Sequence, residues 1–270
     1  MRKRRIISIL LIVFLISSLS ACKKKKEEGE KKPKDITIAC DYSVKPLVDD
    51  LISDYNLNNK TSYKVEYMTL SEAISKLKDK EANLVIAFEG IKDEKLKIEP
   101  IASDGIAIIV NKENNIEGIS MDQLRDIYTG KKVLWKDLNS NMESVQPIAY
   151  ESVVDMQKIF EKKLLSTPTV EMMTNRALIV RDVNAAKDRV TNNINDIAFI
   201  PSICTNANVK VLKLNGVILN VESIKNNLYP FNSNICAYSS KGAEDASKFI
   251  QYLKSDDGKK IIKKHCADAS

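Results

Sequence analysis

Short apolar segments alternate with longer amphipathic segments along most of this chain. Runs rich in branched and aromatic residues predict buried strands, over residues 36–40, 63–68, 84–88, 104–111, 197–200 and 209–214. Apolar residues spaced three and four apart predict helices between and after them, beginning near 45, 70 and 121 and covering 243–253 and 256–266. Strands separated by such helices need crossover connections, so the pattern predicts an α/β fold with a mainly parallel sheet.

Capping residues indicate where two of these helices begin. Thr69 is followed by Glu72, and Ser120 by Gln123, which is the spacing of a capping box. The second of these helices is predicted to end at Gly130.

The N-terminus has the pattern of a secretory leader. Four cations precede a mostly apolar run over 6–16, and a small-residue site over 19–22 ends in Cys22. The run is short for a bilayer span, and the cysteine is typical of a bacterial lipoprotein signal. We predict that residues 1–21 are removed and that Cys22 carries lipid, including palmitate, at the extracytoplasmic face of the cell membrane. The alternatives are a transmembrane anchor and a cleaved leader with an incidental cysteine.

The positive charge of the chain is confined to its beginning. The net charge is +6, but the first 34 residues carry an excess of eight positive charges, which leaves about −2 for the remainder. A nucleic-acid partner is therefore not expected. Residues 22–34 are rich in lysine and are predicted to be a solvated tether, because the lysine-rich stretch cannot bury enough apolar surface to fold.

Several segments, in order, carry a resemblance to a known family. They are Asp104–Asn111 (DGIAIIVN), Leu124–Lys131 (LRDIYTGK) followed by Trp135, Glu151–Phe160, Asp196–Pro201 (DIAFIP), Leu228–Phe231 (LYPF) and Phe249–Ile262. Together they resemble the phosphate-type periplasmic solute-binding proteins, the substrate-binding lipoproteins of phosphate ABC importers. The resemblance covers nearly all of the chain after the tether.

The resemblance implies a fold, a partner and a mechanism. The fold would be a two-lobed periplasmic-binding-protein fold of type II, with a cleft between the lobes. Residues 35–108 and 233–270 would form the first lobe, and residues 109–232 the second. The lobes would close around a small solute, phosphate by resemblance, and then dock on an ABC permease.

The chain departs from the family at the loops that would hold phosphate. The family's Gly-Ser-Thr-Thr type loop falls on Cys40–Ser43, where Asp41 would repel an anion from the helix N-terminus and Ser43 alone keeps a hydroxyl. At the next loop, Thr69 and Leu70 replace Gly-Ser ahead of Ser71.

Two further anion-binding loops are altered. The family's Ser-Arg pair falls on Phe88 and Glu89, so that an acid replaces a bidentate donor. Its Arg-Glu and Ser-Gly-Thr-Arg stretch falls on Tyr150–Glu151 and on 154–157, where neither arginine remains.

These departures lead to a different ligand hypothesis. Carboxylates beside aromatic rings could hold a cationic or amine-bearing solute. The candidate ligand-binding residues are Asp41, Tyr42, Ser43, Thr69, Ser71, Phe88, Glu89, Asp104, Tyr150 and Glu151. In the alternative interpretation, Phe88 belongs to the core, Tyr42 to the lobe surface, and the acids are solvated or paired with lysines. A second class of function is a sensor or partner-binding lipoprotein that reuses the scaffold for something other than transport.

Catalytic and metal chemistry have little support in the sequence. His265 is the only histidine and lies beside lysines near the end of a predicted helix, where its charge is favourable. A nucleophile elbow, a phosphate-binding glycine-rich loop and a histidine cluster with metal spacing are all missing. We therefore expect no enzyme activity, no cofactor and no metal. Cys40, Cys204, Cys236 and Cys266 allow three disulfide pairings, but the simplest interpretation is buried free thiols, since Cys40 and Cys236 lie in apolar strand-like runs.

Overall fold

The computed structural model describes residues 36–59, 63–138, 143–152, 154–166 and 169–269. The predicted leader, Cys22 and the lysine-rich tether lie outside the described residues. Helices and 3₁₀ turns cover α2 Lys45–Asn58, α3 Leu70–Lys78, α4 Met121–Thr129, α5 Asp155–Leu164, α6 Val183–Asn192, α7 Val221–Lys225, α8 Glu244–Lys254, α9 Asp256–His265, η1 Tyr42–Val44, η2 Trp135–Leu138 and η3 Ser202–Cys204.

The strands are short except for one that runs through the centre of the fold. They are β1 Ile36–Asp41, β2 Tyr63–Met68, β3 Leu84–Phe88, β4 Leu96–Asn111, β5 Gly118–Ile119, β6 Gln146–Tyr150, β7 Leu178–Val180, β8 Asp196–Pro201, β9 Val209–Val211, β10 Lys213–Leu214, β11 Asn232–Ser240 and β12 Ala267–Asp268. The main sheet has the order β2-β1-β3-β11-β4-β8-β6-β7.

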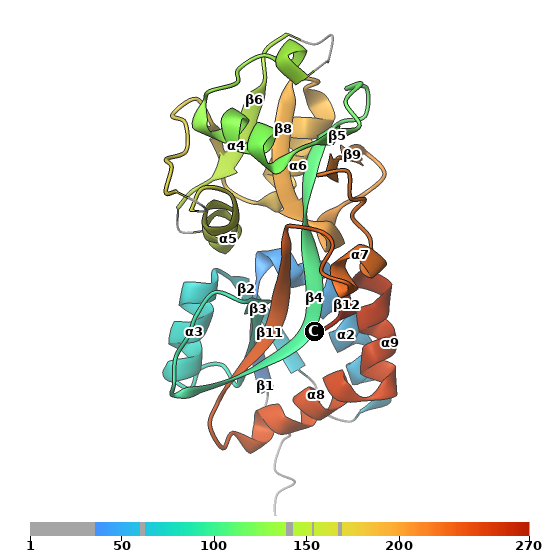
Figure 1. The fold of residues 1–270 in the computed structure, drawn as a ribbon. Coiled ribbons are helices and arrows are strands. Elements are labelled where there is room, and N and C mark those ends of the chain that lie inside the picture. The colour runs from blue at the N-terminus through green and yellow to red at the C-terminus, as the bar shows by residue number, and fades with distance from the viewer. Residues whose placement is uncertain (1–35, 60–62, 139–142, 153, 167–168, 270) are drawn as a thin grey trace, which may run out of the picture. The chain divides into compact units, whose positions relative to one another are not determined.

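Two lobes share the long strand β4. The first lobe contains β1, β2 and β3, which pair in parallel, and β11, which pairs antiparallel with the first part of β4 as far as Gly105. The second lobe contains β6, β7 and β8, and β8 pairs antiparallel with β4 from Ile106 onward. Figure 1 shows β4 continuing from one half of the sheet into the other, with α8 and α9 against the first lobe. The predicted two-lobed α/β fold is confirmed, while the predicted lobe boundaries stay a prediction.

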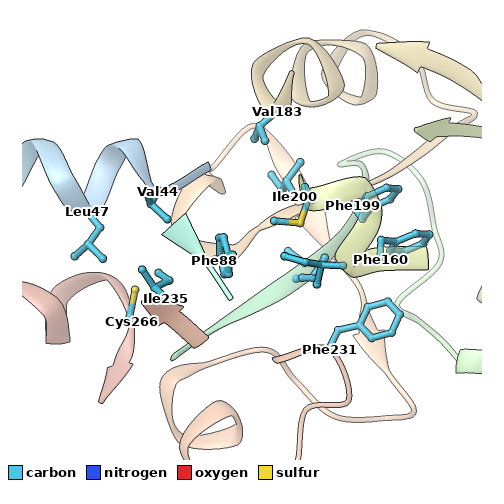
Figure 2. Close-up of a cluster of buried hydrophobic side chains, with 14 of the residues drawn as sticks. Val44, Leu47, Phe88, Phe160, Val183, Phe199, Ile200, Phe231, Ile235 and Cys266 are labelled. Carbon is cyan, nitrogen blue, oxygen red and sulfur yellow. The ribbon is translucent and has the colours of Figure 1, made fainter. Parts of the chain in front are cut away.

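Aromatic side chains fill the core of the second lobe. Phe160 of α5 stacks on Phe199 of β8 with ring centroids 3.6 Å apart, and Phe231 meets Phe160 edge-on at 5.6 Å. Figure 2 shows these three rings together. All three are fully buried, so the face of α5 that carries Phe160 is fixed against the sheet. This packing holds the beginning of α5 in place beside the other lobe.

The predicted helix starts agree with the structure. Thr69 and Ser120 each make a complete capping box, and Gly130 ends α4 with a φ of 81°, which favours glycine. The strand predicted over 209–214 is wrong as a single element. The amide of Leu212 donates to Ile108 of β4 at 2.8 Å, whereas the next amide turns to Glu117 at 3.1 Å, so the chain changes partner and forms β9 and β10.

Candidate functional site

A cavity of about 860 Å³ lies between the two lobes, and we call it the central cavity. Its walls are formed by segments that follow directly after the strands β1, β2, β6, β7 and β8. Ligand sites of α/β sheets form at these carboxyl ends, because the loops there converge on helix N-termini. The lining residues are Asp41, Tyr42, Ser43, Lys45, Pro46, Asp49 and Thr69 from the first lobe, and Val154, Met156, Arg181–Asn184, Lys187 and Ile203–Thr205 from the second.

Asp41 is the most deeply placed acid of the central cavity. Only 7% of the residue is exposed, and its Oδ1 accepts hydrogen bonds from the Ser43 amide at 2.9 Å and from the Ser43 hydroxyl. Burial raises the pKa of Asp41 to about 6, against the lowering effect of the Ser43 bonds. Among the described residues, no lysine or arginine lies within ion-pair distance of this carboxylate. Asp41 is therefore a buried acid without a cationic partner.

A second carboxylate joins the lobes next to the central cavity. Asp155 is the first residue of α5 in the second lobe, and its Oδ2 accepts a hydrogen bond of 2.8 Å from the amide of Leu70, the first residue of α3 in the first lobe. Its Oδ1 lies 3.2 Å from the ammonium group of Lys158. A carboxylate thus fills the helix N-terminus at which an anionic ligand would receive a hydrogen bond.

The remaining charges of the cavity wall are largely paired with one another. Lys45 lies 2.8 Å from Asp49 and 4.2 Å from the ring centroid of Tyr67, which is a cation–π distance. Arg181 pairs with Asp182 at 3.1 Å. These two cations are balanced by acids, so they add little attraction for an anionic solute, whereas Lys187, a third cation of the lining, donates to the carbonyl of Cys204 at 3.2 Å.

Aromatic and apolar surface accompanies the charges. Tyr42 is 55% exposed, and its ring centroid lies 6.2 Å from that of Tyr67. Val154, Met156 and Ile203 contribute apolar side chains to the opposite wall. The cavity can therefore accommodate a solute that has both a polar group and a hydrocarbon part.

The structure brings four of the predicted ligand-binding residues together in this cavity, namely Asp41, Tyr42, Ser43 and Thr69. Ser71 is exposed in the first turn of α3, and Glu151 is exposed after β6. Neither lines the cavity.

Three of the predicted residues are buried in the protein instead. Phe88 belongs to the hydrophobic core, and the hydroxyl of buried Tyr150 donates to the carbonyl of Phe199 at 2.7 Å. Asp104 is fully buried within β4 and accepts hydrogen bonds from the Ser202 hydroxyl and from an amide of η3 at 3.3 Å. Burial raises the pKa of Asp104 to about 6. These side chains hold the framework around the cavity and do not line it.

Glu89 lines a separate cavity of about 350 Å³ beside α5. Lys162 and Lys163 also line it, together with polar side chains of β4 and β11 such as Ser103 and Asn234. Burial, and the neighbouring charge of Lys162, lower the pKa of Lys163. Glu89 is therefore separated from the acids of the central cavity.

Asp155, the α6 segment and η3 are the parts of the site that the candidate set missed. Asp155 falls in the stretch 154–157 whose family resemblance pointed to phosphate, and it introduces an acid there, as Glu89 does in its own loop. That reversal of charge was the available signal. The sequence held no comparable signal for Arg181–Asn184, because the preceding strand β7 has only three residues.

One cysteine, Cys204, lies at the wall of the central cavity. Cys40, Cys204, Cys236 and Cys266 are free thiols, so no disulfide joins them. Burial raises the pKa of Cys204 to about 12, which keeps the thiol at the cavity wall protonated. Within the described part of the chain, no group of histidine, cysteine and acidic side chains is arranged to hold a metal ion.

Comparison with known proteins identifies the family. Residues 26–257 match the model of the PBP superfamily domain. The chain is 28% identical over 204 residues to the phosphate-binding protein PstS of Staphylococcus epidermidis, a match that covers 70% of this chain and 60% of the relative. It is 31% identical over 109 residues to PstS 2 of Streptococcus agalactiae, over 38% of this chain and 37% of that one. The chain thus spans about three-fifths, or less, of the length of these relatives.

Solved structures agree with this assignment. An ABC-type phosphate transport receptor from Vibrio cholerae superposes with a TM-score of 0.71 at 25% identity, covering 86% of this chain and 98% of that one. A structure from Clostridium perfringens, described as a phosphate ABC transporter substrate-binding protein with bound phosphate, gives 0.81 at 24% identity over 87% of this chain and 100% of that one. The chain therefore belongs to the PBP superfamily and is similar to phosphate-binding proteins of ABC importers.

Proposed function

We propose that this protein is the lipid-anchored, extracytoplasmic solute-binding subunit of an ABC importer, and that its solute carries a cationic group instead of being free phosphate. Capture would occur by closure of the lobes over the central cavity, followed by docking on the permease. The family membership and the leader-like N-terminus support the transport role. The buried carboxylate of Asp41, which has no cationic partner among the described residues, is the observation that carries the ligand class.

Electrostatics argue against free phosphate in the central cavity. Two like charges about 4 Å apart repel by about 4 kcal/mol at an effective dielectric constant of 20, which exceeds the net gain of several neutral hydrogen bonds. Asp41 and Asp155 both lie where family loops would meet the anion. Neither carboxylate would repel a protonated amine. Asp41 would gain the partner that it lacks in the described chain, and the nearby Tyr42 ring would add cation–π attraction.

The ligand class can be tested by calorimetric titration of the mature chain, residues 22–270, with phosphate, sulfate, primary amines and amino acids. We expect heat and thermal stabilisation with an amine-bearing solute and none with phosphate. A solute at about a hundred times its dissociation constant adds about 2.7 kcal/mol to the free energy of unfolding. Tight phosphate binding by the wild type would refute the proposed ligand class.

Asp41→Asn provides a matched control for this titration. The asparagine keeps an oxygen that can accept the Ser43 hydrogen bonds but has no charge. If the amine pairs with Asp41, this variant binds it at least about tenfold more weakly. Unchanged amine affinity would remove Asp41 from the binding site.

The membrane anchor is a separate part of the proposal. Residues 1–21 would be cleaved and Cys22 lipidated, and the chain from 22 to 34 would link the lipid to the folded part. Among the described residues, none of the helices combines the length and apolar character needed to cross a membrane. Radiolabelled palmitate fed to cells should label the wild type and not Cys22→Ser. Equal labelling of both would refute the anchor.

A further inference from the structure

The hydrogen bond between Asp155 and Leu70 joins the two lobes beside the central cavity. It connects residues 85 positions apart, it is buried, and it joins the N-terminus of α5 in one lobe to the N-terminus of α3 in the other. Both carboxylate oxygens are engaged, because Lys158 approaches the second oxygen. Two of the acids that line the cavity act locally. Asp41 accepts from Ser43, two residues away, and Asp182 accepts from the third residue after it as an ordinary helix cap.

The Leu70 amide has no intrahelical partner of its own, because the first amides of a helix lack preceding carbonyls. The capping box of α3 leaves it free, since the side chains of Thr69 and Glu72 each satisfy the other's amide. An anionic ligand at this helix end would compete with Asp155 for the Leu70 amide. Asp155 already occupies it.

We propose that Asp155 is a specificity-determining residue that acts as the protein's own anion at the N-terminus of α3, excluding phosphate and sulfate from it and tying the two lobes together. This inference rests on the proposed function, in that it takes the region of the central cavity as the solute site. It adds that exclusion of anions depends on occupation of one amide and not only on the summed negative charge of the cavity.

Three variants separate the effect of occupying the Leu70 amide from the effect of the negative charge of Asp155. Asp155→Ala removes the carboxylate and exposes the Leu70 amide. Asp155→Asn removes the charge but keeps an oxygen that can accept from the amide. Glu151→Ala is the matched control, because it removes one exposed acid from the same loop without touching Leu70. Each full mature chain is titrated with inorganic phosphate and with sulfate by calorimetry.

We expect Asp155→Ala to bind these anions at least about tenfold more tightly than the wild type, a factor that corresponds to about 1.4 kcal/mol. Asp155→Asn should gain less, and Glu151→Ala should not gain. A folded Asp155→Ala that is as insensitive to anions as the wild type would overturn the inference, and so would an equal gain in Glu151→Ala. Phosphate binding by the wild type would instead count against the proposed ligand class, so the two failures are distinguishable.

The wild type offers a second readout that needs no variant. In hydrogen exchange followed by NMR, the Leu70 amide should exchange slowly, because it is buried and donated to Asp155. Rapid exchange at Leu70 in the folded wild type would overturn the inference even if Asp155→Ala failed to fold.

Discussion

Replacing Asp41 with asparagine should stabilise this protein at neutral pH. The side chain is almost fully buried, and burial raises its pKa from 3.8 to about 6. The folded state therefore binds the Asp41 proton more tightly than the unfolded chain does. Asparagine can accept the same two hydrogen bonds from Ser43 through its carbonyl oxygen and has no charge to desolvate.

The size and sign of the effect follow from proton linkage. Below about pH 3.8 the carboxyl is protonated in both states, so its burial costs nothing electrostatically. Between pH 3.8 and 6 the unfolded chain loses the proton first, so the free energy of unfolding falls as the pH rises. A difference of about two pKa units corresponds to about 3 kcal/mol once both states are ionised. Asp41→Asn should thus exceed the wild type by up to about 3 kcal/mol at pH 8 and match it near pH 4.

Urea denaturation of both proteins from pH 4 to pH 8 measures this difference. Burial also raises the pKa of Asp104 to about 6, so this residue is expected to impose a similar pH dependence on the free energy of unfolding. Asp41→Asn should therefore remove only part of the fall in stability with rising pH. Glu94→Gln, at an exposed acid, is the control and should follow the wild type at every pH. The reasoning is refuted if Asp41→Asn is less stable than the wild type at pH 8. That result would mean that the ionised carboxylate is fully compensated in the folded state.

Three further substitutions test the packing and the helix ends. Phe160→Ala should lower the free energy of unfolding, measured in urea, by about 3–5 kcal/mol, because it removes a buried ring stacked on Phe199. A loss below about 1 kcal/mol would contradict this packing. Gly258→Ala should lower the free energy of unfolding by about 1–3 kcal/mol and the melting temperature by several degrees, since a Cβ there would lie 2.2 Å from the Tyr252 carbonyl oxygen. An unchanged melting curve would show that α8 and α9 can separate freely. Thr69→Ala should lower the free energy of unfolding by about 0.5–2 kcal/mol through loss of the capping box, whereas Thr69→Ser should stay close to the wild type. Equal losses in both variants would show that the hydroxyl is not the cap.

Local patterns predicted the elements of the first lobe well. The strands expected over 63–68 and 84–88 coincide with β2 and β3, because the first alternates apolar and charged residues and the second is continuously apolar. The strand expected from 104 in fact begins at Leu96, since its first part includes exposed charged residues that break the apolar run. Its length depends on pairing with β11, which is distant in sequence and which local periodicity does not report.

The candidate site was predictable where it depends on loops and not where it depends on side-chain direction. Asp41, Tyr42 and Ser43 line the cavity because they follow the carboxyl end of β1 directly. Phe88 ends a strand as well, but its side chain turns into the core, and a reading of loop positions alone does not distinguish the two cases. The contact between α3 and Asp155 requires two lobes to meet across 85 residues, which only the tertiary structure reveals.

The two acids that replace family-like anion donors are not equivalent. Asp155 has an amide and an ammonium group as partners, so its charge is compensated within the protein. Asp41 accepts from Ser43 and has no cationic partner among the described residues, and its ionisation is opposed by burial. A buried acid that destabilises the folded state and still faces a cavity is typical of a functional site, because a ligand can supply the missing charge. Under the proposed function, Asp155 would exclude anions from the N-terminus of α3, and Asp41 would be the group that a cationic solute completes.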